Sequence, residues 1–190
     1  MFLAALAPAA ILSYRAYTGG DLGVNPVETL THETGQWALR FLLASLAITP
    51  IRRLTGWNRI IIFRRMLGLF AFFYAVLHLS VWMVFDHYFT IETMWADIVK
   101  RPFITMGTLA LVLMVPLALT STKGWIRRLG SRWTQLHRLV YVSAAAAVLH
   151  FIWKEKVIID ETLMYAGILA VLLAIRVFFA WRKRAARAAV

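Results

Sequence analysis

The protein has 190 residues, of which 61% are hydrophobic and none is cysteine, and its formal net charge is +12. Soluble domains are only about half apolar, so this chain has too little polar surface for a water-soluble globule. The absence of cysteine excludes disulfides, iron–sulfur clusters, thiolate zinc sites and thioether-attached haem. The positive charges lie in short clusters between apolar runs, which is typical of a membrane protein and not of a nucleic-acid-binding protein.

Transmembrane helices are the first elements that the sequence predicts, because a bilayer core of about 30 Å requires roughly 20 apolar residues in a helix. The first candidate, Phe2–Tyr14, is short and is followed by Arg15. We interpret it as a helix, with a cleaved signal peptide as the alternative because AALAPAA offers small residues. Longer stretches follow near Trp37–Ile51, Met66–Phe85, Phe103–Thr120, Leu136–Trp153 and Leu163–Trp181. With no internal repeat or long linker, the sequence predicts an all-α polytopic transmembrane helical bundle of about six spans, with residues 1–190 as one domain.

The charges between these stretches predict the orientation of the bundle, because Lys and Arg in short loops are retained on the cytoplasmic side. Segments 52–65, 123–132 and 182–187 carry bases and no acid. All nine acids lie in the other connections, namely Asp21, Glu28, Glu33, Asp86, Glu92, Asp97, Glu155, Asp160 and Glu161. Six spans would therefore place both termini in the cytoplasm.

Histidines within the spans are the first candidates for chemistry, because ionisable groups inside a membrane are costly and usually functional. His32 and His87 lie in outward loops and are expected to be solvated. His78 lies in the outer half of the third span and His150 near the outer end of the fifth, so antiparallel neighbours can bring them to one depth. Two neutral imidazoles facing each other in a bundle are suitable axial ligands for haem iron. The alternative is an interhelical hydrogen bond, with nearby small residues serving helix packing.

His137 is the candidate for an inner site, about 20 Å from His150 along an ideal helix. The two rings would lie roughly 140° apart around the axis unless the helix is distorted. Arg64 is on nearly the same helical face as His78 and stands where an inner partner would be expected. Arginine stays protonated and is normally a poor iron ligand. His137 is therefore either part of an inner cofactor site or an interfacial histidine.

Arginines near the span ends have two interpretations. Arg40, Arg138 and Arg176 lie at or just inside these ends. Their long side chains can reach the headgroup region, which is the preferred interpretation. They can alternatively pair with haem propionates, which are carboxylates.

Several stretches of the chain resemble the MsrQ (YedZ) family of haem-binding membrane subunits, which belongs to the ferric-reductase-like transmembrane group. They are NPVETLTHETGQWAL at 25–39, ITPIRRLTG at 48–56, RRMLGLFAFFYAVLHL at 64–79, KRPFITMGTLAL at 100–111 and LALTSTKGWIRRLGSRWTQLHRLVYV at 117–142. The family's haem-linked histidines fall on His78, His137 and His150. The wider group has four histidines in two pairs, and Arg64 stands where the fourth would be.

The resemblance implies six transmembrane helices in the bacterial inner membrane, haem b (one or two) and use of FMN. It also implies electrons from the quinone pool and their delivery to MsrP, a periplasmic molybdenum-containing methionine sulfoxide reductase. No strand–GxGxxG–helix unit occurs in the chain, so a nicotinamide or FAD domain of its own is not expected.

Together with the resemblance, the sequence indicates an electron-transfer subunit that passes electrons from membrane quinol through haem to an outward-facing reductase. No residue is predicted to make or break bonds, and no nucleic acid is expected as a partner. One alternative is a stand-alone ferric or cupric reductase. Another is a haem-free bundle that acts as a transporter or assembly factor, in which the histidines would relay protons or form hydrogen bonds.

Overall fold

The computed structural model describes residues 2–155 and 160–188, and within these residues the chain is helical and contains no strand. The all-α prediction is therefore confirmed. The long helices are α1 (Phe2–Thr18), α2 (Pro26–Thr55), α3 (Ile61–Val81), α5 (Pro102–Leu119), α8 (Leu139–Lys154) and α9 (Asp160–Ala188). The shorter elements are η1 (Asn58–Ile60), the π-helical turn η2 (Trp82–Asp86), α4 (Ile91–Lys100), α6 (Lys123–Leu129) and α7 (Ser131–Leu136).

Local sequence signals define both ends of α2. The side chain of Asn25 accepts a hydrogen bond from the backbone N–H of Glu28, at 3.3 Å, and Pro26 occupies the first helical position, where no N–H is needed. At the other end Gly56 has a φ of +72° and donates its N–H to the carbonyl of Arg52. Glycine adopts this left-handed conformation without strain, so the helix ends there.

Several helices have the length and composition of membrane spans. Among the described residues these are 58–86, 102–119, 131–154 and 160–186, which match four of the predicted stretches, except that Thr120 lies one residue beyond its helix. Helices α1 and α2 fall outside this set. Helix α1 has 17 residues, and α2 combines its apolar residues with polar and charged ones over 30 residues. The chain is thus a polytopic membrane protein, and the number of six spans stays a prediction.

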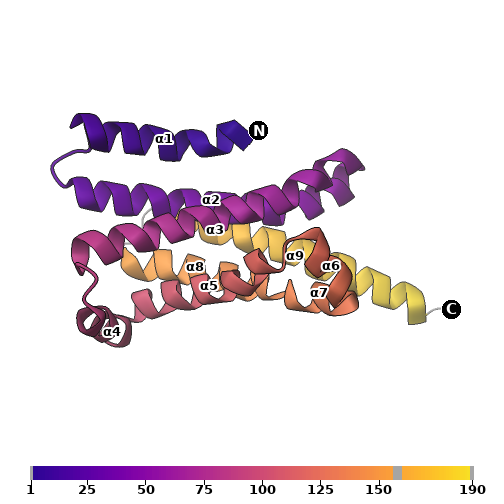
Figure 1. Ribbon diagram of the computed structural model, residues 1–190. Coiled ribbons are helices and arrows are strands. Elements are labelled where there is room, and N and C mark those ends of the chain that lie inside the picture. The colour runs from indigo at the N-terminus through magenta and orange to yellow at the C-terminus, as the bar shows by residue number, and fades with distance from the viewer. Residues whose placement is uncertain (1, 156–159, 189–190) are drawn as a thin grey trace.

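The bundle is built around two closely packed helix pairs, α2 with α3 and α5 with α8. Figure 1 shows these pairs side by side, with α9 lying against α2 and α8. Helix α1 runs antiparallel to α2 on one flank, and its N-terminus points toward the same end of the bundle as the C-terminus of α9 (Figure 1). The main core cluster between the helices consists of Leu39, Leu42, Leu43, Leu46, Ala71, Met114, Ala144, Val148, Phe151, Tyr165, Leu169 and Leu172.

Tyr74 fastens α1 to the bundle. Its side chain is fully buried, and its hydroxyl donates to the carbonyl of Ala5 at 2.8 Å and accepts from the N–H of Ala9 at 3.0 Å. These two backbone groups are one turn apart, so the hydroxyl inserts into the hydrogen-bond ladder of α1. The hydroxyl of one α3 side chain therefore adds a polar attachment to the apolar contacts of α1 with Phe70.

We expect Tyr74→Phe to lower the free energy of unfolding by about 1 kcal/mol, the typical net value of a hydrogen bond in a folded protein. The loss should be local, because the hydroxyl contacts only α1. Hydrogen exchange should become faster in residues 2–18 and stay unchanged in α8. A variant of the neighbouring exposed ring, Phe73→Leu, serves as the control, and equally fast exchange in that variant would contradict the role of the hydroxyl.

Candidate functional site

The structure brings two of the candidate histidines together. His78 lies on α3 and His150 on α8, both partly buried, and their ring centroids are 6.0 Å apart with an angle of 76° between the planes. An imidazole nitrogen binds a metal at about 2 Å, so two rings that bind one metal ion from opposite sides have centres on the order of 6 Å apart. The spacing of the pair therefore suits a shared iron.

Each of these histidines is oriented by a backbone carbonyl of the neighbouring helix. Nδ1 of His78 lies 2.8 Å from the carbonyl oxygen of Thr31 on α2, and Nδ1 of His150 lies 2.6 Å from that of Phe103 on α5. A carbonyl oxygen can only accept, so Nδ1 is the protonated nitrogen in both rings. This leaves the lone pair of Nε2 for a metal, the arrangement by which most metal-binding histidines are oriented.

Two glycines lie against these rings, and neither was predicted from the sequence. A Cβ added at Gly35 would lie 3.0 Å from Nδ1 of His78, and one at Gly107 would lie 2.8 Å from Nδ1 of His150. The distance at Gly107 is shorter than real Cβ atoms show, and the distance at Gly35 is at the lower limit, so each helix comes closest to its histidine at a residue without a side chain. Only glycine allows the backbone to come this close.

The two halves of this site are built alike. Each histidine lies 47 residues after its carbonyl acceptor, and each glycine follows the acceptor by one helical turn. The pairs α2–α3 and α5–α8 thus repeat one arrangement, contrary to the expectation of no internal repeat. The repeat is hidden in the sequence because only these few positions match, but the equal spacing of the Gly and His positions is a signal that could have revealed it.

His137 and Arg64 line a different site at the other end of the bundle. They lie on the wall of one cavity of about 310 Å³, together with Arg65, Phe72 and Trp133. The cavity is separate from the pair of facing rings, because His78 and His150 are not among its lining residues. The structure thus brings His137 and Arg64 together and keeps both apart from His78 and His150.

His137 occupies a break between two helices. Helix α7 ends at Leu136 and α8 begins at Leu139, so the predicted continuous span is interrupted at His137. This is the kind of helix distortion that was needed for the rings of His137 and His150 to share a face. The ring of His137 stacks on Trp133 at 3.9 Å between centroids, and its Nδ1 lies 3.1 Å from the Trp133 carbonyl. Its Nε2 is buried and makes no hydrogen bond of ordinary geometry within the described part of the chain. This nitrogen is available to a ligand in the cavity.

The expectation for the remaining histidines is corrected. His87 was expected to be solvated, but it is buried, its Nε2 lies 3.2 Å from Asp97, and its ring contacts Trp82. The π-helical turn η2 folds the connection back and buries the ring. His32 belongs to α2 and not to a loop, and its Nε2 lies 3.9 Å from Glu155.

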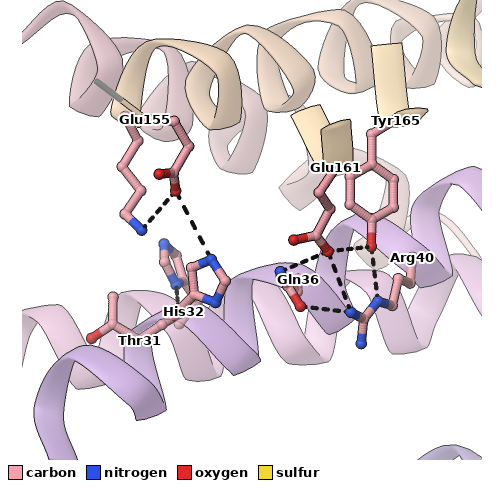
Figure 2. A network of polar contacts seen from close by, with 9 residues as sticks. Thr31, His32, Gln36, Arg40, Glu155, Glu161 and Tyr165 are labelled. Carbon is pink, nitrogen blue, oxygen red and sulfur yellow. Dashed lines mark hydrogen bonds and ion pairs between the residues drawn. The ribbon is translucent and has the colours of Figure 1, made fainter. Parts of the chain in front are cut away.

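Two of the arginines near span ends bind neighbouring helices. Arg176 donates to the Tyr141 hydroxyl and to the Leu46 carbonyl, at 2.7 and 2.5 Å. Arg40 belongs to a network between α2 and α9 that Figure 2 shows from close by, and donates to the Tyr165 hydroxyl at 2.9 Å. In both cases the guanidinium ties helices together.

The helical fold and its apolar spans define a polytopic membrane protein, in which one histidine from each of two helix pairs faces the other. Residues 34–148 match the family described as "Ferric reductase like transmembrane component". The chain belongs to this family and, within it, to the MsrQ proteins. A relative from Herminiimonas arsenicoxydans is 52% identical over 97% of this chain and 85% of its own length, and one from Rhodospirillum rubrum is 52% identical over 97% and 88%. A third, from Xanthomonas euvesicatoria pv. vesicatoria, is 51% identical over 97% and 85%. Each is named "Protein-methionine-sulfoxide reductase heme-binding subunit MsrQ".

Proposed function

We propose that the protein is the haem b-binding membrane subunit of a methionine sulfoxide reductase system and carries electrons through the bilayer to a partner. The observation that carries this proposal is the pair of facing rings of His78 and His150. A carbonyl of a neighbouring helix binds Nδ1 of each ring and leaves the lone pair of Nε2 for a metal. The names of the relatives support the same cofactor and the same system.

The residues of the outer site fit haem b. Haem supplies one-electron chemistry when it is bound. His78 and His150 would hold the haem iron through their Nε2 atoms, and the carbonyls of Thr31 and Phe103 orient the rings and raise their basicity. Ala71 and Ala144, both fully buried, are small residues on α3 and α8, the two helices that carry these histidines.

The inner cavity is assigned to a second cofactor, either a second haem or FMN. His137 offers an imidazole nitrogen without a hydrogen bond, and Arg64 and Arg65 offer positive charge at the cavity wall. Positive charge suits both the propionates of haem and the phosphate of FMN. The resemblance to MsrQ supports FMN, and His137 supports haem, so the cofactor content of variants distinguishes the two.

We expect His137→Ala and Arg64→Ala to lower the inner cofactor at least severalfold and to leave the outer haem spectrum unchanged, because the two sites share no lining residue. The measurement is haem and flavin per protein after extraction. Arg53→Ala is the matched control, because Arg53 lies over the Phe179 ring and is not part of the cavity wall. Equal losses in Arg64→Ala and Arg53→Ala would show that Arg64 acts only as a topology charge.

We further propose that quinol in the bilayer is the electron donor and that an MsrP-like periplasmic reductase is the acceptor. The acidic connections 16–35, 86–102 and 154–162 would face the periplasm, with both termini in the cytoplasm of a bacterium and the protein in its inner membrane. Residues 156–159 lie outside the described part of the chain, and much of 16–35 and 86–102 is helical. Glu155 lies 3.9 Å from His32. His32 directly follows Thr31, whose carbonyl oxygen contacts His78, so the outer site is close to the acidic end of the bundle.

The test has two stages. An absorption spectrum of the purified protein, oxidised and dithionite-reduced, should show b-type haem, and a colourless preparation that takes up no added haem would favour the haem-free transporter or assembly factor. The protein is then placed in liposomes with a reduced quinone analogue, the partner reductase and a methionine sulfoxide substrate. Absorption changes should report reduction by quinol and reoxidation only when partner and substrate are present. Reoxidation by ferric chelates instead would indicate a stand-alone ferric reductase.

A further inference from the structure

A shallow groove runs along the flank of the bundle between α2 and α9. It encloses about 260 Å³, and its walls are apolar, formed by Leu43, Ala44, Ala47 and Ile168. Ile168 is 40% exposed on a helix with the length and composition of a membrane span, so the groove is open toward the surrounding lipid. Two polar side chains, Arg40 and Tyr165, close one end of it. A molecule that enters from the bilayer thus meets apolar walls and one polar end.

The polar end carries hydrogen-bonding groups of both kinds. Arg40 donates to Gln36 at 2.6 Å and to Tyr165 at 2.9 Å, and Gln36 donates to Glu161 at 2.9 Å (Figure 2). The carboxylate of Glu161 lies 3.7 Å from the Arg40 guanidinium. Hydroxyl, guanidinium and carboxylate groups therefore lie close together at this end, with Arg40 and Tyr165 lining the groove and Glu161 beside them. The side chains of Arg40 and Glu161 are 36% and 33% exposed.

The charges at this end select the kind of head group. Glu161 balances the charge of Arg40, so the site has no net positive charge to attract a phosphate. A hydroxyl of a neutral head group can instead donate to Glu161, and a hydroxyl or carbonyl oxygen of it can accept from Arg40, or from Tyr165 in place of the long 3.5 Å bond that this hydroxyl donates to Glu161. A hydroquinone or quinone ring on an apolar tail combines these groups with a tail that suits the walls.

The groove is also close to the facing histidines. Gly35 lies against His78, and Gln36 follows it directly. Arg40 lies five residues after Gly35 on the same helix, α2. Five residues of α-helix rise by about 7.5 Å. A ring held at the polar end is thus about two turns of helix or less from the position of the outer site along α2.

We propose that this groove binds the head group of a lipid-soluble quinol, with Arg40, Glu161 and Tyr165 as its polar contacts and Ala44 under its ring. The proposal rests on the proposed function, in which quinol is the electron donor, and it adds the place where the quinol binds.

The test uses the full-length protein in membranes and a photoreactive short-chain quinone analogue, with labelled peptides mapped by mass spectrometry. Label is expected in residues 36–47 and 161–172 and should be displaced by excess unlabelled quinone. Ala44→Phe fills the groove and should lower labelling at least tenfold. Val112→Phe, a change of the same kind at an exposed position of α5 outside the groove, should leave labelling unchanged. Label that maps elsewhere would overturn the proposal.

Glu161→Gln separates a quinol from an anionic lipid, and Tyr165→Phe, which keeps the shape of the groove, provides a second variant if Ala44→Phe fails to fold. Both changes should lower quinone labelling severalfold and raise by a similar factor the quinol concentration needed for half-maximal haem reduction. Stronger binding of phosphatidylglycerol to Glu161→Gln, with displacement of the label by that lipid, would overturn the proposal. Specific groove labelling without haem reduction by quinol would support the site and reject quinol as the electron donor. Haem reduction by quinol that is unaffected by all three variants would support quinol as the donor and reject the groove as its site.

Discussion

Replacing either His78 or His150 by alanine is expected to remove most of the low-spin haem signal, because each change would delete one of the two imidazoles that are proposed to bind the same iron. The loss of haem affinity should exceed the roughly 10- to 100-fold that removal of an outer-shell partner of a metal ligand costs. The two variants should be alike, because the two rings are held in the same way by Thr31 and Phe103. The measurement is haem per protein together with the reduced-minus-oxidised spectrum.

His32→Ala is the matched control for these variants. His32 lies one residue after Thr31, at the same end of α2, and contacts Phe151 and Glu155. Loss of its imidazole removes a partly exposed ring near the site without touching the facing pair. A wild-type spectrum in both His78→Ala and His150→Ala would refute the pairing. Loss of haem in His32→Ala alone would identify His32 as the iron ligand instead.

Gly107→Ala is expected to destabilise the protein and disturb the outer site, although the same exchange usually stabilises a helix by about 0.5–1 kcal/mol. The added Cβ would lie 2.8 Å from Nδ1 of His150, so α5 and α8 must separate or the ring must turn. Overpacking of this kind costs about 1–3 kcal/mol. We expect a lower free energy of unfolding, a shifted haem spectrum and a weaker effect for Gly35→Ala, where the distance is 3.0 Å.

Gly167→Ala is expected to change the free energy of unfolding in the opposite direction. Gly167 lies in α9, and a Cβ added there meets nothing within 4 Å. This variant should gain about 0.5–1 kcal/mol and keep the wild-type spectrum. Thermal unfolding followed by the haem band measures all three variants. A stabilised Gly107→Ala variant with an unchanged spectrum would show that the close approach of α5 to His150 is not required.

The apolar runs and the depth of the histidines could be predicted from the sequence alone. Helices that match four of the predicted stretches have the length and composition of membrane spans, because a long uninterrupted apolar run can form few other structures. His78 and His150 could be paired for a similar reason, since both lie in the outer halves of their stretches and antiparallel helices align equal depths. These inferences depend on residue type and position along the chain, which the sequence states directly.

The tertiary structure decided how the histidines are held. The carbonyls of Thr31 and Phe103 orient the rings, and a backbone carbonyl is present at every residue, so nothing in the sequence singles out those two. Gly35 and Gly107 acquire their role only when α2 meets α3 and α5 meets α8.

The same reason explains the differences at the other sites. His87 is buried because a π-helical turn folds it against Trp82 and Asp97, and His137 faces the inner cavity because the helix is interrupted beside it. Arg40 and Glu161 are far apart in the chain and meet only where α2 and α9 pack. Local periodicity reports which face of a helix is apolar, but the partner of that face depends on how distant helices pack, and only the folded bundle determines that.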